Sequence, residues 1–103
     1  MPTVKLVKAN DGIHKYKAIF MDDDKKKTVA FGAAGMGDYT KYSRKSDAIG
    51  DKHKELYLAR HAAREDWNDP FSPGALSRWI LWNERTLESS FADYLRRFGF
   101  QRA

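Results

Sequence analysis

The chain of 103 residues has the length of one small domain, and its 42% hydrophobic and 14% aromatic residues are enough to bury one core. It has no cysteine, which excludes disulfides, thiolate nucleophiles and cysteine-based zinc sites. The net charge of +5 favours polyanions as partners. No leader pattern follows Met1 and no uncharged stretch reaches the roughly 20 residues that span a bilayer, so we expect a soluble, non-secreted protein without membrane contact.

Three segments near the start of the chain alternate apolar and polar residues with the period of a β-strand. Their apolar positions are Val4 and Leu6, then Tyr16, Ala18 and Phe20, then Val29 and Phe31. The simplest assembly is an antiparallel β-meander over about residues 3–32. The charged run at residues 22–27, three aspartates followed by three lysines, is typical of an exposed hairpin tip.

A glycine-containing loop is expected over residues 33–45. The glycines follow the order Gly-x-x-Gly-x-Gly from Gly32 to Gly37, with no Lys-Ser/Thr after them, so neither the dinucleotide-binding nor the P-loop fingerprint is met. We interpret the segment as a strand exit in which Asp38 caps a turn. No cofactor is predicted.

The first helix is expected from Ser46, a suitable N-cap, to about Trp67. It carries Arg60, His61 and Arg64, and His61 stands four residues before Glu65, a spacing that can hold a metal ion. No third ligand follows by motif. A hydrogen-bonded structural histidine is the preferred interpretation, and no metal site is predicted.

Two further helices complete the helical part, residues 46–103. One begins at Ser72-Pro73, a cap followed by proline at the first helical position, and runs for roughly ten residues. The other begins at Thr86 and ends at Gly99. The whole chain, residues 1–103, is therefore predicted to be a single α+β domain, whose three helices pack through Trp67, Trp79, Trp82, Phe91 and Phe98.

Several uncommon residue types stand at fixed offsets along the chain: Phe31-Gly32-Ala33, Gly35, Asp38-Tyr39-Thr40, Tyr57, Arg60-His61, Arg64-Glu65, Trp67, Ser77-Arg78-Trp79, Leu81-Trp82-Asn83, Thr86-Leu87, Ser90 and Arg97-Phe98-Gly99. At these positions the chain resembles a family of small uncharacterised basic proteins encoded by large double-stranded DNA viruses of algae and protists. The resemblance covers nearly the whole chain, although Ala75-Leu76 stands before Ser77 where an aromatic pair is common, and residues 40–56 are atypical. It implies a viral origin, a location in the virion or in the cytoplasm or nucleus of the infected cell, and a compact α+β fold. The family has no assigned activity and no established catalytic residues.

The leading functional hypothesis is non-enzymatic nucleic-acid binding, with DNA as the expected partner. The first 52 residues hold 11 lysines and arginines against 7 aspartates, a net charge of +4, and lysine suits diffuse attraction to phosphates. Tyr39 and Tyr42 are the stacking surfaces that remain if the tryptophans are buried. The candidate phosphate contacts are Lys41, Arg44, Lys45, Lys52, Lys54, Arg60 and Arg64.

Two alternatives stay open. In the first, a virion component binds another protein, and a cluster of His61, Trp67, Arg78, Trp79 and Trp82 serves as structural core or interaction surface. In the second, a metal-dependent nuclease or phosphoryl hydrolase uses residues such as His53, His61, Asp38 or Glu65, although their spacing does not show that they converge. No catalytic residue is assigned, and the oligomeric state is not predicted.

Overall fold

The sheet contains the three predicted strands and a fourth short one. In the computed structural model, which describes residues 2–103, β1 (Thr3–Lys8), β2 (His14–Asp22) and β3 (Lys25–Ala33) form the expected antiparallel meander. β4 (Gln101–Arg102) pairs in parallel with β1, which gives the strand order β3-β2-β1-β4. The predicted α+β class, with strands before helices, is confirmed. Sequence periodicity does not reveal β4, because two residues are too few to show a period.

Three helix starts lie where the capping residues predict them. Ser46 caps α2 (Asp47–His61), Ser72 caps α3 (Pro73–Leu76), and Thr86 caps α4 (Leu87–Phe98). In each case the hydroxyl oxygen accepts a hydrogen bond from the backbone N–H three residues later, which satisfies a donor that the helix itself leaves free. α4 ends at Gly99 in the left-handed conformation, as the sequence predicts.

The structure corrects two expectations about the helices. The segment 33–45 is not all loop, because β3 runs to Ala33 and α1 occupies Tyr39–Lys45, where the Asp38 carboxylate accepts from the N–H of Lys41. The helix from Ser46 stops at His61 instead of Trp67. After His61 the chain turns, with the N–H of Arg64 donating to the carbonyl of His61 three residues earlier, and the carbonyl of Trp67 accepts a hydrogen bond from the indole of Trp79.

The second predicted helix continues as a π-helix. After the single turn of α3, η1 (Ser77–Leu81) follows, and the N–H of Trp82 donates to the carbonyl of Ser77, five residues earlier. The molecule therefore has α1, α2, α3 with η1, and α4 in place of three helices. A π-turn inserts one extra residue into a helical turn and changes the direction of the side chains that follow it.

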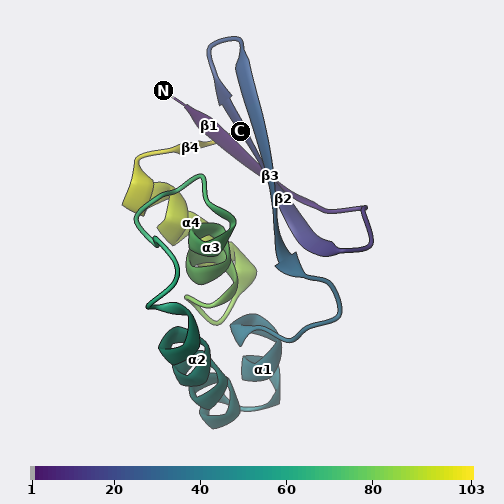
Figure 1. Cartoon of the computed structure of the whole chain (residues 1–103), viewed down its shortest axis with the longest axis vertical. Helices are drawn as coiled ribbons and strands as arrows, with labels where there is room; N and C mark the ends of the chain where they lie inside the picture. The colour runs from purple at the N-terminus through teal and green to yellow at the C-terminus, as the bar shows by residue number, and fades with distance from the viewer. Residues whose placement is uncertain (1) are drawn as a thin grey trace.

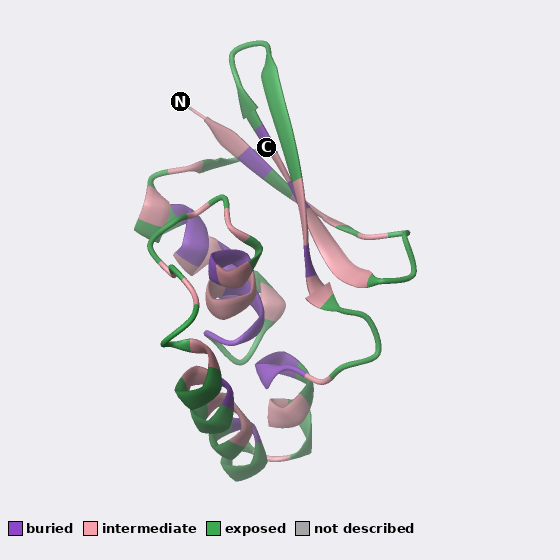
Figure 2. Ribbon diagram, viewed as in Figure 1, coloured by how far each residue is buried: buried purple, intermediate pink, exposed green. Residues whose placement is uncertain are grey.

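The helices cover one face of the sheet, and α1 and α2 pack together beyond its end (Figure 1). The buried side of the sheet carries Val4, Ala18, Phe20 and Phe31. Figure 2 shows the tip of the β2–β3 hairpin fully exposed, as predicted for residues 22–27. Within residues 2–103, no helix has the length and apolar character needed to cross a membrane. In the hydrophobic core, the buried side of the sheet packs against Leu76, Ile80, Leu81, Trp82, Phe91, Tyr94 and Leu95 of the helical part.

Gly32, near the end of β3, has a φ of +76° and lies directly against η1. A Cβ atom at this position would lie 2.8 Å from Cδ1 of Leu81, which is buried. We expect Gly32→Ala to lower the free energy of unfolding by about 1–3 kcal/mol, because it combines a left-handed backbone with a steric clash. Urea denaturation followed by far-UV circular dichroism measures this loss.

Gly35 provides the matched control, since its φ is +81° but a Cβ atom there would have no neighbour within 4 Å. Gly35→Ala therefore tests the backbone conformation alone. Equal losses in the two variants would show that the contact with Leu81 does not contribute.

Candidate functional site

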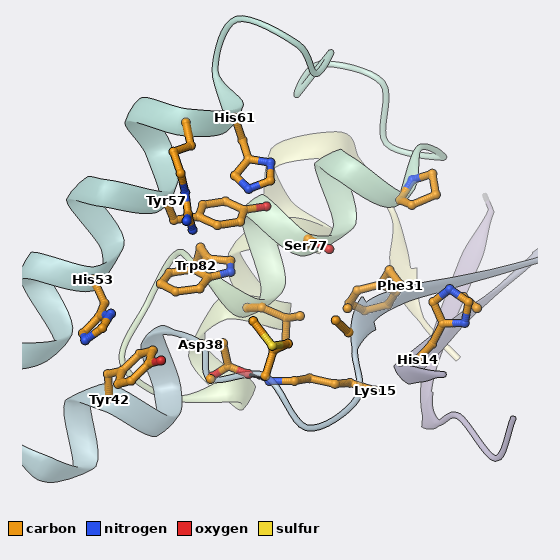
Figure 3. Close-up of a pocket in the computed structure, with 18 of the residues that line it drawn as sticks. His14, Lys15, Phe31, Asp38, Tyr42, His53, Tyr57, His61, Ser77 and Trp82 are labelled. Atoms are coloured by element: carbon orange, nitrogen blue, oxygen red, sulfur yellow. Dashed lines mark hydrogen bonds and ion pairs between the residues drawn. The ribbon is translucent and has the colours of Figure 1, made fainter. Parts of the chain in front are cut away.

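A groove of about 820 Å³ opens between the end of the sheet and the helices. One wall is the side of α2 from His53 to His61, and the opposite wall comes from the start of β2, the end of β3 and the loop that follows it. Ser77 and Trp82 line it from η1 and the residue that follows (Figure 3). Its size lies within the range of small-molecule sites. Segments far apart in the sequence therefore form one concave surface.

Five rings that line the groove form a connected wall, which we call the aromatic wall: Tyr42, His53, Tyr57, His61 and Trp82. Tyr42 and His53 are stacked with 3.6 Å between ring centroids, and Tyr57 is stacked between Trp82 at 4.4 Å and His61 at 4.2 Å (Figure 3). Tyr42 lies 6.4 Å from Trp82 and joins the two stacks. A histidine thus stands at each end of the wall.

All three histidines of the chain line this groove. His61 Nδ1 lies 3.1 Å from Oε2 of Glu65, and His14 Nδ1 lies 2.8 Å from Oδ2 of Asp11. A carboxylate at Nδ1 fixes the orientation of the ring and leaves Nε2 for another partner. The preferred interpretation of His61, a hydrogen-bonded histidine, agrees with its contact to Glu65.

An ion pair between Lys15 and Asp38 is nearly buried within the groove (Figure 3). Lys15 Nζ lies 2.6 Å from Oδ2 of Asp38, and the two side chains are 10% and 5% exposed. Burial by itself raises the pKa of Asp38, but hydrogen bonds from Lys15, Thr40 and the N–H of Lys41 outweigh it and hold the pKa below its ordinary value of 3.8. Asp38 is therefore a charged carboxylate that ties β2 to the start of α1.

The rim of the groove is apolar and exposed. Ile13 is 68% exposed, Met36 63% and Leu56 48%, and each of the three lines the groove. They come from three different segments, the β1–β2 turn, the loop after β3, and α2. Large apolar side chains gathered around a concavity are typical of binding sites, whereas single exposed ones need no explanation.

Six of the seven predicted phosphate contacts are exposed. Among residues 2–103 none of the six has a carboxylate within 4.0 Å. Arg60 also lines the groove, and Lys45 lies three residues after Tyr42 on the same side of α1. The six are therefore available to a polyanion: Lys41, Arg44, Lys45, Lys52, Arg60 and Arg64.

Lys54 is the exception, because its ammonium group points into the protein. Its Nζ donates to the backbone carbonyl of Asn83 at 2.7 Å and lies 4.8 Å from the ring centroid of Tyr39. Burial and the nearby Arg78 guanidinium lower the pKa of Lys54. Lys54 thus joins α2 to the segment after η1 and does not contribute to the exposed basic surface. Tyr39 is buried too, whereas Tyr42 is part of the aromatic wall.

The predicted histidine, arginine and tryptophan cluster divides into two parts. His61 and Trp82 belong to the aromatic wall. Arg78 lies over the rings of Trp67 and Trp79, at 5.4 and 4.1 Å from their centroids, and donates to the carbonyl of Trp82. Trp67 is partly buried in this second group and lies outside the main core, contrary to its predicted place in the helix packing.

Arg97 lies 3.7 Å from the Trp79 centroid and bonds to Asp93, so this second group is held together by contacts within the chain. Burial lowers the pKa of Arg78, with Arg97 as the next cause. In this group Trp67, Arg78 and Trp79 are half-buried and contact one another, whereas His61 and Trp82 line the groove.

Comparison with known proteins adds one match. Residues 4–46, which cover 43 of the 103 residues, are similar to a family described as a family of unknown function (DUF5754). The matched part holds β1 to β3 and α1, and so includes Lys15, Asp38 and Tyr42 but not the α2 side of the groove. No curated protein and no solved structure matches the chain.

Proposed function

We propose that the protein binds single-stranded nucleic acid without catalysing a reaction on it. One observation carries the proposal: the aromatic wall and the guanidinium of Arg60 line the same groove, next to unpaired basic side chains of α1 and α2. Proteins that bind single strands without sequence preference combine aromatic rings, on which bases stack, with cationic groups that contact phosphates.

The charges around the groove support an anionic ligand. Its lining includes two cations, Lys15 and Arg60, and one anion, Asp38, which is paired with Lys15. The unpaired positive charge is therefore that of Arg60. Lys41, Arg44 and Lys45 on α1 add positive charge beside it. If one base of a nucleic-acid strand lay in the groove, the phosphates on either side of it would be attracted by the positive charges of these residues.

Binding to a labelled single-stranded oligonucleotide, measured by fluorescence anisotropy across a salt series, tests the proposal. We expect the affinity to fall steeply between about 50 and 200 mM salt. In Lys45→Gln/Arg60→Gln, the slope of log K against log salt is expected to decrease by about 1.4, because each lost phosphate contact removes about 0.7. His53→Leu is expected to weaken binding about 5-fold or more, since it removes one ring from the aromatic wall.

Lys8→Gln/Lys25→Gln is the matched control, because it removes the same charge from two side chains, at the end of β1 and the start of β3, that do not line the groove. If the control changes the slope by the same amount, the change reflects the net charge of the protein and not the position of Lys45 and Arg60. No binding of wild-type protein at the lowest salt would refute the proposal.

The apolar rim favours a second candidate function, the docking of an apolar segment of another protein. Ile13, Met36 and Leu56 do not resemble phosphate contacts, and their exposure is the specific observation for this candidate. It corresponds to the virion interaction component considered from the sequence. If oligonucleotides do not bind, this candidate becomes the preferred one.

The residues considered for a nuclease or phosphoryl hydrolase do share this groove, since His53, His61 and Asp38 line it and Glu65 bonds to His61. Within residues 2–103, no three potential metal ligands are grouped closely enough to hold an ion. The hydrolase stays a prediction from the sequence. So do the viral origin, the preference for DNA and the place in the virion or infected cell.

A further inference from the structure

The sheet has a second face, which the helices do not cover (Figures 1 and 2). Side chains alternate between the faces of a strand, so the neighbours of the buried residues Val4, Ala18, Phe20 and Phe31 lie on this open face. Among residues 2–103, all of these neighbours are exposed or half-buried. The open face carries Lys5, Val7, Lys17, Ile19, Met21, Lys26, Thr28 and Ala30.

The charge on the open face has one sign. Each of the three long strands contributes one lysine that has no carboxylate within 4.0 Å in residues 2–103: Lys5, Lys17 or Lys26. Lys15, at the groove end of β2, is paired with Asp38. Asp22 is the one acidic residue of these strands. It follows the same alternation as Ala18 and Phe20 and therefore lies on the opposite face of the sheet. Lys5 and Lys17 are diagonal neighbours, about 7–8 Å apart.

The open face is continuous with the groove. Ala30 lies on this face opposite Lys17 in the register of β2 and β3, and Ala30 also lines the groove. Lys15, two residues before Lys17 on β2, lines the groove as well. A ligand that leaves the groove along β2 therefore reaches Lys17 first and then Lys5 and Lys26.

We infer that the open face of the sheet extends the nucleic-acid site, so that a strand anchored in the groove continues along β2 over Lys17, Lys5 and Lys26. This inference rests on the proposed function. The face has no aromatic side chain, so its contacts are with phosphates, whereas the groove supplies the ring contacts. A polyanion complements three unpaired lysines, and β2 and β3 supply an extended path for it.

The experiment is a length series of single-stranded oligothymidylates, from about 4 to about 16 nucleotides, measured by anisotropy at several salt concentrations. In the wild-type protein, long oligonucleotides are expected to bind more tightly than short ones, with a salt slope steeper by about 2. In Lys5→Gln/Lys17→Gln/Lys26→Gln, short oligonucleotides are expected to bind as in wild type, while the extra affinity and extra slope of long ones disappear.

The double variant Lys8→Gln/Lys25→Gln again serves as the control, because by the alternation neither lysine lies on the open face. It is expected to keep the gain with length. Retention of that gain in the sheet-face variant would overturn the inference while leaving the proposed function intact. Failure of even short oligonucleotides to bind wild-type protein would refute the proposed function itself.

Discussion

Truncation of Trp82 to alanine is expected to lower the free energy of unfolding by about 3–5 kcal/mol. The indole is buried, belongs to the core, and stacks on Tyr57 with ring planes 8° apart. Its removal leaves a cavity between η1 and α2 and breaks the aromatic wall at its centre. A small domain has only about 5–15 kcal/mol of stability, so this loss is a large fraction of the whole. Urea denaturation followed by circular dichroism gives the value.

Trp82→Phe separates stability from binding. The phenyl ring keeps the contact with Tyr57, so this variant is expected to fold and to retain most of the affinity for a single-stranded oligonucleotide. A denaturation midpoint of Trp82→Ala equal to that of the wild type would contradict the central position that the structure gives to this residue.

Asp38→Ala is expected to cost a similar amount, about 3–5 kcal/mol, because it leaves the Lys15 ammonium buried without a counter-ion. It also removes the acceptor for the hydroxyl of Thr40 and for the N–H of Lys41 at the start of α1. Thermal and urea unfolding measure the loss. Lys15→Met is expected to cost less, since Asp38 keeps two of its three donors.

The double variant Lys15→Met/Asp38→Ala tests the coupling between the two residues. Its loss is expected to be smaller than the sum of the two single losses, because no unpaired charge remains. Strict additivity would show that the ion pair does not contribute to stability and that Asp38 acts through the cap alone.

The pH dependence provides a second test of Asp38. Its pKa is lower in the folded protein than the ordinary value of 3.8, so its contribution to stability is complete above about pH 4. As the pH falls below 3.8, the unfolded chain takes up the proton first and the contribution is lost. The stability of Asp38→Ala is therefore expected to fall less steeply with acid than that of the wild type.

Local signals predict much of this fold. The caps Ser46, Ser72 and Thr86 set three helix starts, because a hydroxyl acceptor three residues before a free N–H is a short-range interaction. The alternation of β1 to β3 likewise reports which face is buried. Helix α1 is not predicted from the sequence, because it is only seven residues long. Its cap, Asp38, also bonds to Lys15, which lies 23 residues earlier, and a local sequence pattern cannot reveal such a contact.

The candidate site is less predictable than the fold. The sequence identifies basic residues and an aromatic cluster, but the choice between core and surface depends on tertiary contacts. Lys54 and Lys52 are both lysines of α2, yet one bonds to the carbonyl of Asn83 and the other is exposed. Ile13, Lys15 and Met36 enter the groove from segments that the sequence assigns to strand and turn. Their contribution becomes visible only once the chain is folded.

The π-turn of η1 makes the number of residues in this segment a property of the binding site. If the same number of residues were wound as an ordinary α-helix, the side chains that follow would be rotated by about 100°. Trp82 would then leave the aromatic wall. Because the π-turn absorbs one residue, a relative with ordinary helical spacing at this point would have to be one residue shorter to keep the indole in the wall.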